Sequence, residues 1–249
     1  MRVAALYDIH GMLEPLEAVL RELEHEDVDA VVIGGDAVSG PQPLETNECL
    51  RALELPVHWI RGNGERALGP DGADAVMDPS SESLEFTKSQ FSEKQRDELS
   101  GLPASVTLEL DGLGETLFCH ASPRNDLDIV TVLTPEDRLR ALLDGVSQQV
   151  VVSGHTHMQF DRVVDGTRWV NAGSVGMPYE GNVAAFWAIL GPAVELRRTE
   201  FDVDRLAAAL LASGWPEADP FVAENLRAAP TRHETAALFE QIAADRGER

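Results

Sequence analysis

The sequence "VAALYDIHG", residues 3–11, changes from an apolar run to a polar loop where Asp8 follows Tyr7. Short apolar runs of the same kind recur along the chain, with helix-like stretches between them, at Ala30–Ile33, Val57–Ile60, Thr116–Cys119 and Val150–Val152. Buried strands that alternate with helices are typical of α/β proteins. The pattern that begins at Val3 therefore predicts an α/β fold in which helices cover a buried sheet.

The segments between and after these runs predict further elements. Leucine and valine recur at helical spacing from Met12 to Glu26, so this segment should be an amphipathic helix. Asp165-Gly166 separates two extended runs, at residues 159–164 and 167–171, which is a strong hairpin signal. Two more extended runs flank Gly191-Pro192. The second half of the chain should therefore be largely antiparallel.

We predict a main domain over residues 1–202 and a C-terminal helical extension over residues 203–249. A polar, partly helical insertion interrupts the main domain at residues 70–101. Alanine and leucine dominate after residue 203 and prolines interrupt them, which indicates two or three short helices and a frayed tail at 246–249. Three roles stay open for these helices: closing over a site, packing against the main domain, and forming the interface of a homo-oligomer.

Composition limits the partners and the cellular location. The chain has 20 Lys and Arg against 43 Asp and Glu, a net charge of −23, which would repel a nucleic-acid polymer. Cys49 and Cys119 are too few for a disulfide framework, which favours a reducing cytoplasm. Asp8 interrupts the apolar start, and the longest apolar run, Val183–Leu190, is too short to span a bilayer. We therefore expect a cytoplasmic protein with neither a membrane nor a nucleic-acid partner.

A loop with metal-binding residue types follows each of the five apolar runs. Because the carboxyl ends of strands in α/β sheets gather ligands, these loops should converge on one edge. Nitrogen and oxygen donors of this kind suit manganese, iron or zinc rather than thiolate-bound structural zinc. The candidate metal ligands are Asp8, His10, Asp36, Asn63, His120, His155 and His157.

Seven ligands are more than one metal ion needs, so we expect two ions. Two cations roughly 3.5–4 Å apart repel each other unless an anion lies between them. Asp36, which follows Gly34-Gly35, is the candidate bridge. Each motif alone also has a structural interpretation: Gly34-Gly35-Asp36 is often just a turn, and His120 is compatible with a hydrogen-bonded core histidine. Their shared position after a strand favours the metal site.

In this order, the motifs resemble those of the calcineurin-like metallophosphoesterase superfamily, whose pattern is DxH, GDxx, GNHD/E, a later histidine, and GHxH. The resemblance covers roughly residues 1–200. Residues 170–178 further resemble the "NPGSVG" segment of the YfcE-like branch of small bacterial and archaeal phosphodiesterases. The resemblance implies a four-layer fold, in which two mixed β-sheets pack as a sandwich flanked by helices.

The resemblance also implies a ligand set and a reaction. The first metal ion would be held by Asp8, His10, Asp36 and His157, and the second by Asp36, Asn63, His120 and His155. Two divalent or trivalent ions, of manganese, iron, zinc or nickel, would place a metal-bound hydroxide for in-line attack on a phosphate ester. The residues assigned to catalysis are Asp36, Asn63 and Arg124.

Gly64 departs from the superfamily pattern, because many members carry a histidine at this position, between the asparagine and the acidic residue. A glycine neither contacts the phosphate nor protonates a leaving group. Arg124, Arg61 and Tyr179 are candidate substitutes, although both arginines equally fit surface ion pairs. The missing histidine favours phosphodiester substrates.

The main hypothesis is a dinuclear metal-dependent phosphodiesterase that hydrolyses a small phosphodiester or nucleotide. One alternative is a phosphoprotein phosphatase or phosphomonoesterase, with residues 70–101 as a substrate-facing cap. The other is a noncatalytic metal-binding scaffold, because the retromer scaffold subunit resembles the same superfamily. The complete ligand set weighs against the scaffold.

Overall fold

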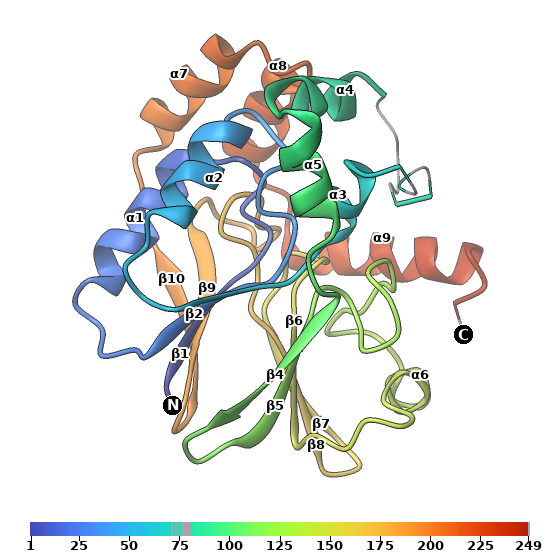
Figure 1. The fold of residues 1–249 in the computed structure, drawn as a ribbon. Helices are drawn as coiled ribbons and strands as arrows, with labels where there is room; N and C mark the ends of the chain where they lie inside the picture. The colour runs from blue at the N-terminus through green and yellow to red at the C-terminus, as the bar shows by residue number, and fades with distance from the viewer. Residues whose placement is uncertain (71, 73, 76–80, 249) are drawn as a thin grey trace.

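Two five-stranded β-sheets pack face to face, with helices outside each sheet (Figure 1). The structure is a computed structural model that describes residues 1–248 except 71, 73 and 76–80. The predicted α/β sandwich of two mixed sheets is confirmed. Part of the predicted insertion, residues 70–101, lies outside the described residues, and the division of the chain at residues 202 and 203 stays a prediction.

The first sheet contains the strand that follows the chain start. Strands β1, β2 and β3 run parallel to one another, and β9 is antiparallel to both β1 and β10. In spatial order the strands are β10 (Val194–Thr199), β9 (Ala185–Leu190), β1 (Val3–Leu6), β2 (Ala30–Ile33) and β3 (Val57–Trp59). All the strands expected here are present.

The second sheet contains the predicted hairpin, β7–β8, and pairs β8 in parallel with β6. In spatial order its strands are β4 (Ser105–Leu110), β5 (Gly114–Cys119), β6 (Val150–Ser153), β8 (Thr167–Asn171) and β7 (Phe160–Val164). The sequence interpretation missed β4. Its signal is weak, because Val106 and Leu108 are only partly buried and polar residues alternate with them.

Alternation along β1 explains how one strand joins two apolar cores. Val3 and Ala5 face the second sheet, whereas Ala4 and Leu6 face the helices, so the whole strand is buried. The Tyr7 hydroxyl donates a hydrogen bond to the Val152 carbonyl, 3.1 Å away, on the opposite sheet. The two sheets are thus held together directly beneath the loops that follow β1 and β6.

Helices cover the outer faces of both sheets. The core outside the first sheet includes residues of α1, α2, α4 and α5, and the core outside the second includes residues of α6. Their bounds are α1 (Leu13–Leu23), α2 (Pro43–Arg51), α3 (Asn63–Ala67), α4 (Ser81–Gln90), α5 (Glu93–Ser100) and α6 (Glu136–Leu142). In the described part of the chain, none of the helices has the length and apolar character needed to cross a bilayer.

The C-terminal segment packs beside the loops at one end of the sandwich, together with α4 (Figure 1). Trp215 and Phe221 share an apolar cluster with Met12 and Met177, which lie in those loops. The prediction of a frayed tail at residues 246–249 is wrong for Glu248, because this residue accepts a hydrogen bond from the Ile129 amide, 3.1 Å away. The elements are α7 (Val203–Ser213), α8 (Ala218–Phe221), the π-helix η1 (Val222–Leu226) and α9 (Arg232–Asp245).

Candidate metal centre

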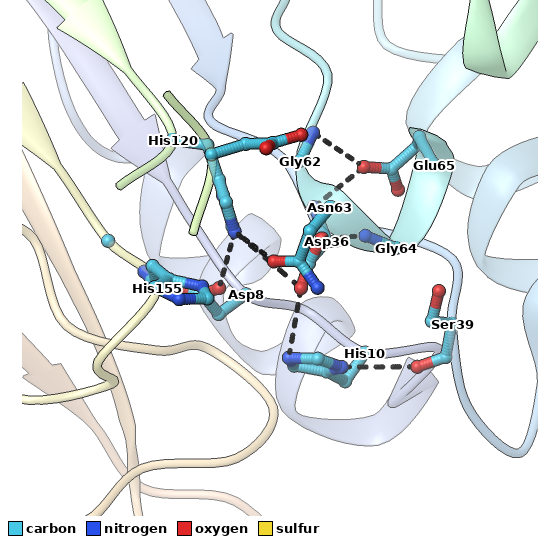
Figure 2. A network of polar contacts seen from close by, with 12 residues as sticks. Asp8, His10, Asp36, Ser39, Gly62, Asn63, Gly64, Glu65, His120 and His155 are labelled. Carbon is cyan, nitrogen blue, oxygen red and sulfur yellow. Dashed lines mark hydrogen bonds and ion pairs between the residues drawn. The ribbon is translucent and has the colours of Figure 1, made fainter. Parts of the chain in front are cut away.

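All seven predicted ligands meet at one place, between the carboxyl ends of strands from both sheets. Figure 2 labels all of them except His157. The loops after β1, β2 and β3 supply four of them, and the loops after β5 and β6 supply the other three. Figure 2 shows His10 and His120 directed toward Asp36 from opposite sides. The convergence expected from the strand–loop pattern is therefore what the fold produces.

Asp8, His10 and His157 form one cluster, whose facing atoms all lie within 4.8 Å of one another. The Nε2 atoms of His10 and His157 are 3.1 Å apart, and Nε2 of His157 is 3.4 Å from Oδ1 of Asp8. Both Nδ1 atoms face backbone carbonyls, at 3.2 Å for His10 and 2.7 Å for His157, which assigns the ring proton to Nδ1. Two Nε2 lone pairs then face each other, an arrangement that a cation stabilises.

Asp36, His120 and His155 form the second cluster, again with facing atoms within 4.8 Å of one another. Nδ1 of His120 lies 3.0 Å from the Gly34 carbonyl, so Nε2 is directed into the centre. There it lies 3.1 Å from Oδ1 of Asn63 and 3.6 Å from Oδ2 of Asp36. Asn63 thus joins this cluster through its side-chain oxygen.

Asp36 lies between the two clusters. Its Oδ1 accepts a short hydrogen bond, 2.6 Å, from the Gly64 amide. Its Oδ2 faces both clusters, 3.6 Å from Nε2 of His120 and 3.9 Å from Nε2 of His10. One carboxylate oxygen is therefore fixed by the backbone, and the other occupies the position expected of a bridge.

The donor set fits two metal ions. Oδ1 of Asp8 and Nε2 of His155 are buried and have no hydrogen-bond partner among the described residues. Unpartnered buried polar atoms are rare unless a ligand completes them. Two donors that bind one ion at about 2.1 Å lie about 3.0–3.4 Å apart, which matches the closest donor separations in both clusters.

The buried charges shift the pKa values of these groups in opposite directions. Burial lowers the pKa of His120, but the carboxylates of Asp36 and Asp8 raise it more, to about 10. Burial and the neighbouring His120 lower the pKa of His155 to about 4. Burial raises the pKa of Asp36, but the surrounding histidines lower it more, to well below its usual range. Close pairs with diverging pKa values are typical of functional sites.

Backbone strain is concentrated in the same residues. Of the six described non-glycine residues with positive φ, five are candidate ligands, with φ between 51° and 66°: Asp8, His10, Asp36, His155 and His157. Residues other than glycine rarely adopt this left-handed conformation, and asparagine, aspartate and histidine adopt it more often than the rest. Such strain persists where the surrounding structure enforces it, and it often marks a functional site.

Two glycines allow the loops to approach the carboxylates closely. A Cβ at Gly62 would lie 2.2 Å from Oδ1 of Asp36, and a Cβ at Gly154 would lie 2.3 Å from Oδ2 of Asp8. Neither neighbour is able to move, because each carboxylate is held by a backbone amide. These positions therefore exclude every residue with a side chain.

Glu65 braces the centre from behind, a role that the sequence interpretation did not identify. Its carboxylate is 1% exposed and accepts hydrogen bonds from four backbone amides at 2.8–3.3 Å, those of Asp36, Ala37, Val38 and Gly62. The loop after β2 is thereby tied to the loop after β3. The Glu65 carboxylate is directed to these amides and not to the ligand atoms of the two clusters, and its bond to the Asp36 amide holds Asp36 in place.

Residues 171–177 brace the other side. The Ser174 hydroxyl donates to the Asp8 carbonyl at 2.7 Å, and the Met177 carbonyl lies 2.7 Å from Nδ1 of His157. The Asn171 amide donates to the Gly154 carbonyl, also at 2.7 Å. This segment therefore connects the loops that carry Asp8 and His157.

A cavity of about 190 Å³ adjoins the centre. Its floor includes His10, Asp36 and Asn63, and the opposite wall comes from α4 and from Trp215. The Trp215 indole donates a hydrogen bond to the Ser83 hydroxyl, 2.7 Å away, and so ties the C-terminal segment to α4. The volume is below the roughly 300–1,000 Å³ typical of sites for drug-sized ligands.

The structure does not bring Arg124 into this cavity. Arg124 is exposed and lines a neighbouring cavity of about 250 Å³ with Arg61, Arg66 and His120. Its catalytic role stays a prediction. Tyr179 instead stacks on the ring of His157, with centroids 5.2 Å apart, and burial raises the pKa of its hydroxyl to about 12. Tyr179 therefore supports a candidate ligand.

Comparison with known proteins places this geometry in a family context. Residues 1–190 match the model of the calcineurin-like phosphoesterase superfamily domain. MJ0912, an uncharacterised protein of Methanocaldococcus jannaschii, is 24% identical over 236 residues, which cover 86% of this chain and 94% of that protein.

Two solved structures resemble most of this chain. A metallophosphoesterase from Sphaerobacter thermophilus is 25% identical with a TM-score of 0.73, and the match covers 92% of this chain and 100% of that one. PH1004 from Pyrococcus horikoshii OT3, described as a hypothetical protein, is 22% identical with a TM-score of 0.77, over 89% and 97% of the two chains. The second likeness supports the fold alone.

Proposed function

Because the chain belongs to the calcineurin-like phosphoesterase superfamily, as its motif order predicted, we propose that it is a two-metal phosphoesterase acting on a small phosphodiester. One observation carries the proposal: seven donors form two facing clusters around Asp36, and two of the buried donor atoms have no partner among the described residues. Manganese, iron, zinc and nickel all accept such donors.

When bound, the two ions would neutralise phosphate oxygens and lower the pKa of the attacking water. The protein's own residues hold this arrangement. Asp36 presents Oδ2 to both clusters, and backbone carbonyls orient the rings of His10, His120 and His157. The aligned donors need little rearrangement during reaction, which is the basis of electrostatic catalysis.

The cavity supports a small substrate. Among the described residues that line it, none is lysine or arginine, so the metal ions would supply the positive charge for the phosphate. Its wall of α4 and Trp215 and its volume of about 190 Å³ leave little room for a loop of a phosphoprotein. The net charge of −23 likewise disfavours a nucleic-acid polymer. These features favour a small phosphodiester over a phosphoprotein.

The test is to remove metal from the protein, reconstitute it separately with Mn²⁺, Zn²⁺, Ni²⁺ and Mg²⁺, and measure hydrolysis of bis-p-nitrophenyl and p-nitrophenyl phosphate. We expect metal-dependent turnover with preference for the diester, because Gly64 provides no leaving-group acid. Asp36→Asn should lower kcat/KM at least about 100-fold.

Asp165→Asn is the matched control, because Asp165 also has positive φ but lies in the β7–β8 turn. Preference for the monoester would favour a phosphomonoesterase. Absence of turnover with every metal, although the ions bind, would favour a noncatalytic metal-binding scaffold.

A further inference from the structure

The loop after β2 places a hydroxyl beside Gly64, the position at which many superfamily members carry a histidine (Figure 2). Oγ of Ser39 lies 2.5 Å from the point that a Cβ at residue 64 would occupy. The same point is 2.9 Å from Oδ1 of Asp36. Ser39 therefore fills the space that a side chain at residue 64 would need.

This hydroxyl is buried yet has no hydrogen-bond partner among the described residues. The other two hydroxyl side chains that line the cavity differ in this respect. Thr87 donates to the Ser83 carbonyl at 3.1 Å, and Ser83 accepts the Trp215 indole. Because buried hydroxyls are normally paired, an unpaired one at the wall of a site indicates that a ligand completes it.

The position of Ser39 relative to the metal centre is well defined. Its backbone carbonyl lies 3.2 Å from Nδ1 of His10, and its side chain lines the same cavity as His10, Asp36 and Asn63. A substrate oxygen bound over the Gly64 side of the centre would meet this hydroxyl. Among the described hydroxyl groups that line this cavity, that of Ser39 is the one without a partner.

We propose that the Ser39 hydroxyl donates a hydrogen bond to the leaving-group oxygen of the phosphodiester, in place of a side chain at residue 64. The inference rests on the proposed function and names a further catalytic residue for it. The serine hydroxyl stabilises the negative charge that develops on this oxygen, and its proton stays on Oγ. A leaving group of high pKa needs this help most.

The test compares Ser39→Ala with the wild-type protein on two diesters, methyl p-nitrophenyl phosphate and methyl phenyl phosphate. Phenol leaves less readily than p-nitrophenol, so we expect kcat to fall about 10- to 100-fold for the phenyl ester and about threefold or less for the p-nitrophenyl ester. The variant should fold normally and bind the same amount of metal, because the hydroxyl it loses has no partner within the described protein.

Thr46→Val is the matched control. Thr46 Oγ1 is also buried and unpartnered among the described residues, but Thr46 is not among the residues that line the cavity. This variant should keep the wild-type ratio of the two rates. Equal rate losses of Ser39→Ala on both esters, or no loss on either, would overturn the proposal.

A binding measurement separates this inference from the proposed function. Calorimetry with inorganic phosphate on the metal-loaded proteins should show about fivefold or greater weakening in Ser39→Ala and none in Thr46→Val. If the wild-type protein hydrolysed neither ester, the proposed function would fail. Unchanged phosphate affinity in Ser39→Ala would then also overturn the contact with Ser39, whereas weakened affinity would support it.

Discussion

At the scale of single residues, three candidate ligand histidines share one arrangement. His10, His120 and His157 each direct Nδ1 to a backbone carbonyl and Nε2 to the centre. This contact fixes both the ring orientation and the tautomer, as outer hydrogen bonds do in metal sites. The acceptor atoms that then face each other repel unless a cation lies between them, so without metal this arrangement depends on protons.

His120 should release a proton when the second metal ion binds. Its pKa is raised from 6.5 to about 10, so at pH 8 the metal-free protein holds a proton on Nε2, next to Asn63 and Asp36. His155, with its pKa lowered to about 4, is already neutral and releases none. Calorimetry in buffers of different ionisation enthalpy should detect about one proton per ion at this site.

The sign of the accompanying stability change follows from the raised pKa. The proton stabilises the metal-free fold fully below pH 6.5, and this contribution is lost as the pH rises through about 10. The Tm of the metal-free protein should therefore fall between pH 7 and pH 10. His120→Gln should lack this part of the pH dependence, and a variant that kept it would contradict the assignment.

Glu65→Gln should destabilise the protein although it changes few atoms. A glutamine amide would direct a donor at backbone amides that now donate to the carboxylate. We expect a loss of about 3 kcal/mol in the free energy of unfolding, measured by urea denaturation, together with weaker metal binding. Glu109→Gln, at an exposed position of β4, is the control, and equal losses in both variants would rule out the bracing role.

At the scale of elements, the C-terminal helices take part in the site. Phe239 of α9 packs edge-to-face on Tyr179, with ring centroids 5.8 Å apart, and Tyr179 stacks on His157. Trp215 joins α4 through Ser83 and forms one wall of the cavity. Three roles were left open for the C-terminal helices, and the structure shows that they pack beside the site. Their role in the interface of a homo-oligomer stays a prediction.

Phe239→Ala should therefore act on the metal centre from a distance. Loss of this half-buried ring should lower the free energy of unfolding by about 1–2 kcal/mol and loosen Tyr179 against His157. We expect weaker binding of one of the two ions, measured by metal titration. The neighbouring Leu238, which is 57% exposed, offers the control Leu238→Ala, and an effect of that variant on metal affinity would contradict the mechanism.

At the scale of the whole molecule, the centre joins both halves of the sandwich. The segments that follow β1, β2 and β3 of the first sheet carry Asp8, His10, Asp36 and Asn63, and those that follow β5 and β6 of the second carry the three remaining candidate histidines. Ions bound here connect loops from both sheets. Stability of the entire fold should therefore depend on metal.

Metal removal should lower Tm substantially. An ion present at about 1,000 times its Kd stabilises the folded state by about 4 kcal/mol, which corresponds to about 8–16 °C for a domain of this size. Differential scanning calorimetry with and without a chelator measures the shift. Asp36→Asn, which changes the proposed bridging ligand, should show a much smaller shift, and an equally large one would contradict the bridging position.

The strand–loop order and the types of the candidate ligands follow from local signals in the sequence. A strand is marked by its apolar residues, and a metal ligand by its residue type next to a glycine or a strand end, so both signals are local. Asp8, Asp36 and His155 were accordingly predicted as ligands from the sequence, and the β7–β8 hairpin, which the structure contains, was predicted in the same way. The edge strand β4 was missed because its half-exposed residues carry little of this signal.

The residues that surround the centre are brought together only when the whole chain is folded. Glu65 behind Asp36, Ser39 beside Gly64 and Phe239 against Tyr179 are contacts between residues distant in the sequence. Such contacts leave no periodic or spaced pattern, because they depend on how whole elements pack. For the same reason Arg124 lines a cavity with His120 and not the cavity beside His10, Asp36 and Asn63. The types of the candidate ligands could thus be predicted from local sequence. The residues that support the centre, and the cavity that gives access to it, depend on how the elements pack.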